Sequence, residues 1–122
     1  MRYLVTGGNG FIGSHVVDQL LTTGKEVVVI DKITNQKNAY SRQVRHAARQ
    51  LFMDMSDPNL MEKAIQKDDV IVHLAAQSHV DVSFNNPVET TISNVVGAHS
   101  LLAASVKCGV SKVIIMSTDE VY

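Results

Sequence analysis

Cysteine is nearly missing from this chain, since Cys108 is the single one among 122 residues. A lone cysteine cannot form an internal disulfide, which excludes a fold held together by such bonds. Cys108 lies in a stretch with helical character, and this position favours a buried, unreactive thiol. The five histidines show no metal-ligand spacing, so we expect no metal site.

Strong charge and long apolar runs are also missing. The formal net charge is −1 and the sequence pI is about 6.5. No basic field is therefore available for nucleic acid or for anionic lipid. The uninterrupted apolar runs are only a few residues long and the first of them is strand-like, so we expect neither a membrane span nor an export signal. We expect a cytoplasmic protein without nucleic-acid or membrane partners.

What the chain does contain is an alternation of short apolar runs and longer helical patterns. Its length and its 45% hydrophobic content suit one domain over residues 1–122. Strands that are apolar at successive positions are buried on both faces, which is typical of a parallel sheet covered by helices. We predict a Rossmann-type three-layer α/β sandwich with strand order 3-2-1-4-5, its strands at residues 3–5, 26–30, 50–53, 70–74 and 113–116.

Start and stop signals delimit the predicted helices. A helix over 11–23 ends before Gly24, where a left-handed residue is wanted. Asp57 and Pro58 look like an N-cap and a first helical residue, and predict a helix to about Lys67. The run Asn86 to Glu89 (NPVE) predicts an N-cap and a long helix that reaches Cys108 and ends at Gly109. Residues 32–47 are interpreted as a loop with a short helix around 39–46.

A glycine-rich turn joins the first predicted strand to the first helix. Residues 7–13 read GGNGFIG, which satisfies G-x-x-G-x-x-G and, from Gly8, G-x-G-x-x-G. Such a turn lets the backbone approach a pyrophosphate at a helix N-terminus, where free N–H groups and the helix dipole favour an anion. Because a strand precedes the motif and a helix follows it, we interpret it as a phosphate-binding turn rather than a plain turn.

Polar or small residues follow the next three strands. Asp31 ends the second strand, where a carboxylate accepts hydrogen bonds from an adenosine ribose and favours NAD over NADP. Lys32 is either a solvated loop charge or a group that accommodates a 2′-phosphate. Asp54 either accepts from an adenine amino group, with Met55 against the base, or lies in a helix-entry turn. The small residues of 74–76 let a cofactor pass between the first and fourth strands, at the topological switch point.

The chain closes on the sequence STDEVY (117–122), where hydroxyls and adjacent carboxylates follow the fifth strand. With TGGNGFIGS (6–14), DKIT (31–34), HLAAQSHVD (73–81) and NVVG (94–97), this run resembles the extended short-chain dehydrogenase/reductase family of NAD-dependent epimerases and dehydratases. Within that family it is most similar to the dTDP-glucose 4,6-dehydratases. The matching motifs span the whole chain in the family's order.

The resemblance implies a set of residues that contact NAD. They follow the glycine turn, the strand ends and the start of the long helix: Gly7, Gly10, Phe11, Ile12, Gly13, Asp31, Lys32, Ile33, Thr34, Asp54, Met55, Leu74, Ala75, Ala76, Gln77, Ser78 and Ser93.

It also implies a nucleotide-sugar substrate and a division of catalytic roles. Ser78 and Thr118 would bind substrate, with Thr118 on the sugar. Asp119 matches the acid that protonates the departing C6 hydroxyl, and Glu120 matches the base that removes the C5 proton. Adjacent carboxylates take these two roles only if one is held protonated and the other ionised.

The chain also departs from that family. The Tyr-x-x-x-Lys motif is absent, since Tyr3 has Gly7 and Tyr40 has Val44 four positions on, and Tyr122 is the last residue. The substrate domain is also missing, so we expect a truncated cofactor-binding portion that is inactive alone. Alternatives are a stand-alone nucleotide-binding or interaction module, and a portion of a nucleotide-sugar epimerase or decarboxylase. The apolar run 113–116 would then form an exposed sheet edge, which predicts self-association.

Overall fold

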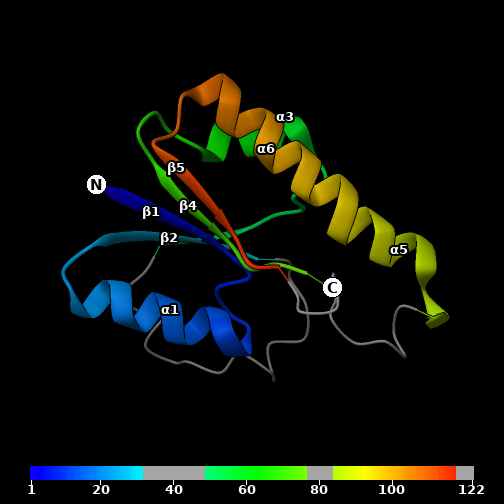
Figure 1. The fold of residues 1–122 in the computed structure, drawn as a ribbon, viewed down its shortest axis with the longest axis horizontal. Coiled ribbons are helices and arrows are strands. Elements are labelled where there is room, and N and C mark those ends of the chain that lie inside the picture. The colour runs from blue at the N-terminus through cyan, green and yellow to red at the C-terminus, as the bar shows by residue number, and fades with distance from the viewer. Residues whose placement is uncertain (32–48, 77–83, 118–122) are drawn as a thin grey trace.

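The protein is described by a computed structural model over residues 1–31, 49–76 and 84–117. Its centre is a parallel five-stranded sheet in the order β3-β2-β1-β4-β5, as the sequence predicts (Figure 1). The predicted short helix at 39–46 lies outside the described residues. The strands are β1 (Arg2–Thr6), β2 (Glu26–Asp31), β3 (Arg49–Phe52), β4 (Val70–His73) and β5 (Lys112–Ile115).

The register of the sheet brings the polar strand ends to one edge. Thr6 at the end of β1 pairs with Ile30 of β2 on one side and with His73 of β4 on the other. Asp31 pairs with Phe52 at the end of β3. Parallel strands all present their carboxyl ends at the same edge, so the residues that follow each strand meet there.

Helices cover both faces of the sheet, with α1 (Phe11–Thr22) on one face and α3 (Pro58–Ala64) and α6 (Gly97–Cys108) on the other (Figure 1). Successive strand residues point to opposite faces. Thus Leu4 packs in the core cluster that includes Leu101 of α6, while Val5 packs in the cluster that includes Val17 of α1. Residues 27–30 of β2 are all buried, in agreement with the prediction of strands covered on both sides.

The two edge strands are more exposed than the three inner ones. In β5, Ile114 and Ile115 are about half exposed, and Met116 just beyond the strand is 57% exposed. The apolar edge expected at 113–116 is therefore present in the structure. Among the described residues, no helix has the length and apolar character needed to cross a membrane.

Helix α3 begins as predicted and ends earlier than predicted. The Asp57 carboxylate accepts hydrogen bonds from the N–H groups of Asn59 (2.9 Å) and Leu60 (3.3 Å), so it is the N-cap. The helix ends at Ala64 rather than near Lys67, because Ile65 is already extended. Beyond it, the Gln66 N–H donates to the carboxylate of Asp69 at 2.8 Å, which turns the chain toward β4.

The predicted long helix is continuous, but it has three parts. A π-helical turn, Ile92–Val96, separates α5 (Pro87–Thr91) from α6. Asn86 is the N-cap residue, as predicted, although its side chain makes no capping hydrogen bond and only its carbonyl accepts, from the Thr90 N–H at 3.0 Å. The expected end is confirmed, since Gly109 is the left-handed C-cap with φ of +74°.

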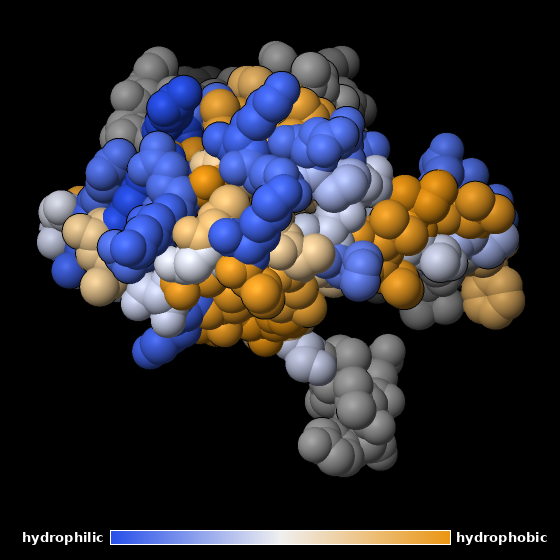
Figure 2. All heavy atoms as spheres, turned by 90° about the horizontal axis from the view of Figure 1, so that it is seen from above, coloured by the Kyte–Doolittle hydropathy of each residue, from blue (hydrophilic) through white to orange (hydrophobic). Residues whose placement is uncertain are grey.

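This helix projects beyond the body of the molecule at its α5 end (Figure 1). Apolar side chains lie exposed along it, including Val88 at 70% and Val95 at 61%. Figure 2 shows apolar side chains both on this projection and on the body of the molecule. Among the described residues, α5 contacts mainly the π turn that continues into α6, and the inner face of α6 packs on the sheet and on α3.

At the amino-terminal end of the sheet, Arg2 and Asp69 form an ion pair that is almost fully buried. The Arg2 guanidinium donates to both carboxylate oxygens, at 2.9 and 2.7 Å, and also to the carbonyl of Ala64 at 2.7 Å. The hydrogen bond to Asp69 raises the pKa of Arg2 above its ordinary value, against the effect of burial. This pair joins β1 to the turn that precedes β4.

Candidate functional site

The turn after β1 is built from glycines because the backbone leaves no room for side chains. Gly7 has a left-handed φ of +70°, and a Cβ there would lie 2.8 Å from the backbone nitrogen of Ala75. A Cβ on Gly13 would lie 2.1 Å from the carbonyl oxygen of Gly7. The first turn of α1 therefore packs directly on the loop, as a phosphate-binding turn requires.

The N-terminus of α1 is available to an anion. Gly10 is its N-cap residue, its first turn contains no acidic residue, and no side chain of the described part of the chain caps it. The Ser14 N–H closes the first helical hydrogen bond on the Gly10 carbonyl at 2.9 Å. Free N–H groups of a first turn and the helix dipole both attract a negatively charged group.

Asp31 lies beside this turn at the end of β2. Its Oδ2 accepts a hydrogen bond from the backbone N–H of Asn9 at 3.1 Å. The Asn9 side chain in turn donates to the side-chain oxygen of Gln50 on β3 at 3.2 Å. The carboxylate is thus tied to the turn that would carry a phosphate, at the side of the site expected for the adenosine ribose.

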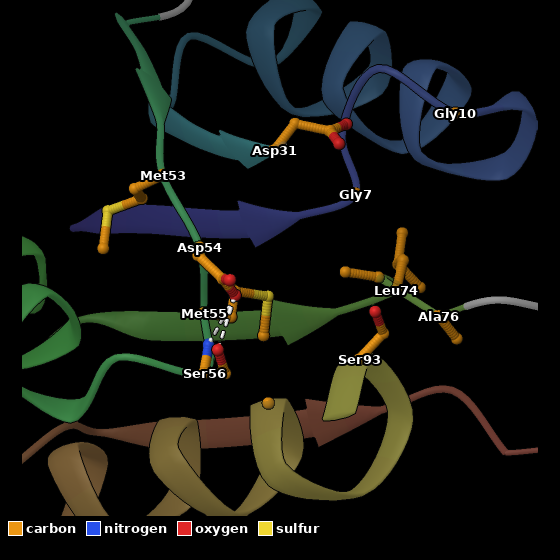
Figure 3. Close-up of a pocket in the computed structure, with 12 residues that line it drawn as sticks. Gly7, Gly10, Asp31, Met53, Asp54, Met55, Ser56, Leu74, Ala76 and Ser93 are labelled. Atoms are coloured by element: carbon orange, nitrogen blue, oxygen red, sulfur yellow. Dashed lines mark hydrogen bonds between the residues drawn. The ribbon is translucent and has the colours of Figure 1, made fainter. Parts of the chain in front are cut away.

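Asp54 serves the local turn and also faces the pocket, so both interpretations of its role remain. Its Oδ1 accepts from the backbone N–H of Ser56 at 2.9 Å and from the Ser56 hydroxyl at 2.8 Å (Figure 3). Met55 is 7% exposed and belongs to the main core cluster while also lining the pocket.

The Thr6 hydroxyl organises the backbone after β4. Its oxygen accepts hydrogen bonds from the N–H groups of Leu74 (3.1 Å) and Ala75 (3.2 Å), and it lies 2.7 Å from Nδ1 of His73. Because two N–H groups donate to this hydroxyl, we assign its own proton to the bond with His73. In this assignment the imidazole accepts at Nδ1 and carries its proton on Nε2.

Burial reinforces this neutral state of His73. The residue is 6% exposed, and desolvation lowers the pKa of the imidazole below its ordinary value. Protonation would place a second donor against the Thr6 hydroxyl and disturb the support of Leu74 and Ala75. The described residues bring together no group of three or more histidine, cysteine, aspartate or glutamate side chains suited to a metal ion.

The far wall of the pocket comes from the long helix. Ser93 lies in the π turn and Gly97 begins α6, and both line the cavity. A Cβ on Gly97 would lie 3.7 Å from Cβ of Met55, an ordinary van der Waals distance, so the helix contacts the segment after β3 and still leaves room for a methyl group there.

These segments enclose one pocket at the carboxyl end of the sheet (Figure 3). The structure brings nine of the predicted cofactor residues together in its lining: Gly7, Gly10, Asp31, Asp54, Met55, Leu74, Ala75, Ala76 and Ser93.

Other predicted residues are placed elsewhere. Phe11 and Ile12 lie outside the lining, 62% and 52% exposed, and the Phe11 ring meets His15 edge-on. Gly13, in the first turn of α1, packs against the backbone of Gly7 and Gly8 in the glycine turn. The predicted residues Lys32, Ile33, Thr34, Gln77, Ser78, Thr118, Asp119 and Glu120 lie outside the described residues.

Sequence reasoning missed three lining residues, Met53, Ser56 and Gly97. Met53 and Ser56 flank the predicted Asp54 and Met55, so a wider window after the third strand would have included them. For Gly97 the only signal was its place inside a helical pattern, where a glycine is unfavourable relative to alanine.

Comparison with known proteins gives consistent matches along the chain. A sequence model described as GDP-mannose 4,6 dehydratase matches residues 4–122. A dTDP-glucose 4,6-dehydratase of Mycobacterium tuberculosis is 38% identical over 100% of this chain and 38% of its own length. A mouse dTDP-D-glucose 4,6-dehydratase is 37% identical over 99% of this chain and 36% of its own.

Solved structures agree with these matches. A dTDP-glucose 4,6-dehydratase from Streptomyces venezuelae, solved with NAD bound, has a TM-score of 0.81 and 40% identity, over 93% of this chain and 38% of that one. A UDP-glucose 4-epimerase from Thermotoga maritima, solved with UDP-glucose, has a TM-score of 0.83 and 37% identity, over 97% and 38%. The chain thus spans a little over a third of the length of these relatives.

Proposed function

Because this chain belongs to the GDP-mannose 4,6-dehydratase family of NAD-dependent epimerases and dehydratases, we propose that its pocket binds NAD. In this proposal the chain is the cofactor-binding portion of a nucleotide-sugar 4,6-dehydratase. We infer the substrate, a dTDP-linked glucose, from the dTDP-glucose 4,6-dehydratases among its relatives. The observation that carries the proposal is the convergence of the glycine turn, Asp31 and the Leu74 to Ala76 segment on one pocket.

The pocket suits each part of a dinucleotide. The pyrophosphate would lie against Gly7 and Gly10, with the N-terminus of α1 behind it. The adenosine ribose would donate to Asp31, and the adenine would lie near Asp54 and Met55. The remainder of the cofactor would pass over residues 74–76 toward Ser93, at the switch point between β1 and β4.

Calorimetric titration with NAD⁺ tests this proposal directly. We expect saturable binding of one NAD⁺ per chain, with weaker binding of NADP⁺ because the Asp31 carboxylate repels a 2′-phosphate. Replacing Asp31 with Asn should reduce the preference for NAD⁺ and leave the fold intact. Absence of detectable binding at millimolar NAD⁺ would overturn the proposal.

We assign the chemistry to residues that follow β5. Asp119 is proposed as the acid and Glu120 as the base, while Thr118 and Ser78 are proposed to bind the nucleotide sugar. The described part of the chain supports this placement, because Ile115 pairs with His73 and the Met116 N–H donates to the His73 carbonyl at 3.2 Å. Ile115 and Met116 thus lie beside the end of β4, the strand that leads into the pocket-lining residues 74–76.

The chain by itself is proposed to lack turnover. It contains no Tyr-x-x-x-Lys motif. By the family resemblance, the tyrosine and lysine of that motif carry out proton transfer at the C4 hydroxyl. We expect no 4-keto sugar when the chain is incubated with NAD⁺ and dTDP-glucose. Formation of such a product, detected by mass spectrometry, would contradict this and would require another group to serve as the C4 base.

An epimerase remains the second candidate, because UDP-glucose 4-epimerases are matched with TM-scores similar to that of the dehydratase. The adjacent carboxylates Asp119 and Glu120 favour the dehydratase. Fusing residues 1–122 to the remaining length of a dehydratase or of an epimerase relative would distinguish the two. Activity with only the epimerase partner would reject the dehydratase assignment.

We further propose that the chain self-associates through the edge of β5. Ile114, Ile115 and Met116 expose an apolar strand edge that a second copy can cover. Light scattering at high micromolar concentration tests this, and a monomeric mass would reject it. The cytoplasmic location remains a prediction from the sequence.

A further inference from the structure

A pair of side-chain amides lies next to Asp31 and is incompletely hydrogen-bonded. Asn9 belongs to the glycine turn and Gln50 to β3, and the Asn9 Nδ2 donates to the Gln50 Oε1 at 3.2 Å. Because β2 lies between β1 and β3, this bond crosses the sheet near the end of β2. That end carries Asp31, whose Oδ2 accepts from the Asn9 backbone N–H.

The other two amide atoms of the pair have no partner among the described residues. They are Oδ1 of Asn9 and Nε2 of Gln50, and both are buried from solvent. Exchanging oxygen and nitrogen in both side chains leaves the same number of atoms unpaired, so the choice of amide orientation does not remove the problem. A buried polar atom without a partner costs about 1 to 3 kcal/mol.

Two apolar side chains at these positions would therefore make the folded state more stable than two amides do. What the amides provide is a directed link from the turn to β3. This link holds the turn at the distance at which the Asn9 N–H meets the Asp31 carboxylate. Loss of the link would leave that N–H free to move away from Asp31 together with the turn.

We propose that Asn9 and Gln50 are positioning residues that fix the Asp31 carboxylate and thereby set the preference for NAD over NADP. This inference rests on the proposed binding of NAD. A fixed carboxylate meets the ribose hydroxyls of NAD in a hydrogen-bonding geometry and meets a 2′-phosphate with repulsion. A carboxylate that can rotate away loses part of both effects.

The test measures NAD⁺ and NADP⁺ affinities by calorimetry for the full chain and for three variants: Asn9→Ala, Gln50→Leu and the double variant. Asn9 does not have a positive φ, so alanine fits its backbone and keeps its N–H. We expect each variant to lower the ratio of NAD⁺ to NADP⁺ affinity by about three- to ten-fold, the equivalent of one net hydrogen bond. Glu62→Gln, on the outer surface of α3, serves as a control and should leave the ratio unchanged.

A second set of variants separates positioning from a general loosening of the site. In an Asp31→Asn background, the Asn9→Ala/Gln50→Leu substitutions should produce no further change in the ratio. Thermal unfolding without ligand adds a second readout, in which the double variant should differ from the single variants. Each single variant leaves one amide without the partner that it has among the described residues and should unfold at a lower temperature. The double variant should regain the unfolding temperature of the original chain or exceed it.

The outcomes are distinguishable. If the original chain binds NAD⁺ and the variants keep its ratio, the positioning role is wrong while the proposed function stands. The same conclusion follows if the ratio falls equally in the Asp31→Asn background. If the original chain binds no NAD⁺, both the proposed function and this inference fail.

Discussion

At the amino-terminal end of the sheet a buried ion pair joins Arg2 to Asp69, whereas at the carboxyl end the buried contact between Thr6 and His73 is neutral. Both contacts link β1 to the neighbourhood of β4, and both involve side chains that are nearly inaccessible to solvent. The difference lies in what surrounds them. The ion pair closes a packed end, whereas the neutral pair borders a pocket.

The charged pair and the neutral pair satisfy their buried polar groups in different ways. A buried charge is acceptable only with its partner in place, and Asp69 also accepts from the Gln66 N–H, so its oxygens are well supplied with donors. At the pocket end, the contact between β1 and β4 needs no ionised group. The neutral Thr6–His73 pair orders the backbone of Leu74 and Ala75 through hydrogen bonds to the Thr6 hydroxyl alone.

The largest effect is expected from Gly13→Ala, which tests whether the pocket end depends on backbone contact. The added Cβ would lie 2.1 Å from the Gly7 carbonyl oxygen, an atom of the main chain. We expect more than about 4 kcal/mol of lost stability, beyond ordinary overpacking, and no measurable NAD⁺ binding.

Gly24→Ala is the matched control for Gly13→Ala. Gly24 has φ of +77° and nothing within 4 Å of a built Cβ. We expect a loss of about 1 to 2 kcal/mol from backbone strain alone, with NAD⁺ affinity unchanged. Equal losses in urea unfolding for the two variants would contradict the close packing of α1 on the turn.

Asp69→Ala tests the closed end. It leaves the Arg2 guanidinium buried without its carboxylate, which typically costs about 3 to 5 kcal/mol. Replacing both partners, as Arg2→Met with Asp69→Leu, should cost less than the single change because no unpaired charge remains. Since the pair lies at the far end of the sheet from the pocket, NAD⁺ affinity of the folded variant should be unchanged. A clear loss of affinity would show that the two ends are coupled.

Thr6→Val tests the neutral end with a side chain of nearly the same shape. It removes the hydroxyl that accepts from the Leu74 and Ala75 N–H groups and contacts His73, whereas the Leu74 N–H keeps its second acceptor, the Thr6 carbonyl, at 3.2 Å. Leaving the Ala75 N–H and His73 without the hydroxyl should cost about 2 to 3 kcal/mol. NAD⁺ affinity should fall as well, because Leu74 and Ala75 line the pocket. Thr6→Ser keeps the hydroxyl and should recover most of the affinity, an outcome not expected if only packing mattered.

The neutral pair should also make stability depend on pH. Burial lowers the pKa of His73 in the folded state, so the unfolded chain binds the proton more readily. The free energy of unfolding should therefore fall as pH drops below about 6.5, by at most about 1.4 kcal/mol per pH unit, until the folded-state pKa is passed. Urea unfolding between pH 8 and pH 5, compared with His73→Asn, isolates this contribution. If the unfolding free energies of the two proteins change in parallel with pH, His73 is not the group that causes the pH dependence.

Sequence reasoning captured the sheet because its signals are local. Each inner strand is a short apolar run, and the glycines at 7, 13, 24 and 109 mark turns and helix ends by themselves. Together with the resemblance to a known family, these signals were enough to predict the strand order and most of the pocket lining. The Asp57 N-cap was predicted correctly for the same reason, since a cap concerns residues two and three positions away.

The features that were missed depend on contacts between distant parts of the chain. The end of α3 is set where the Gln66 N–H meets Asp69, a carboxylate that Arg2 holds from 67 positions away. The link between Asn9 and Gln50 spans 41 positions. The π turn at 92–96 escapes prediction for another reason, because neither a proline nor a glycine marks it within the helical pattern.

The smallest effect is expected from Glu62→Gln, which removes an exposed ion pair and can be compared with removal of the buried Arg2–Asp69 pair. Glu62 of α3 accepts two hydrogen bonds from the Lys107 ammonium of α6, both at 3.1 Å, but the lysine side chain is 70% exposed. Water and salt screen such a pair, so the loss should be about 0.5 kcal/mol or less and should shrink further in 1 M salt. Urea unfolding at low and high salt measures it beside Asp69→Ala, whose loss should persist at high salt because its charges are buried. Equal salt sensitivity of the two variants would mean that burial does not distinguish the two ion pairs.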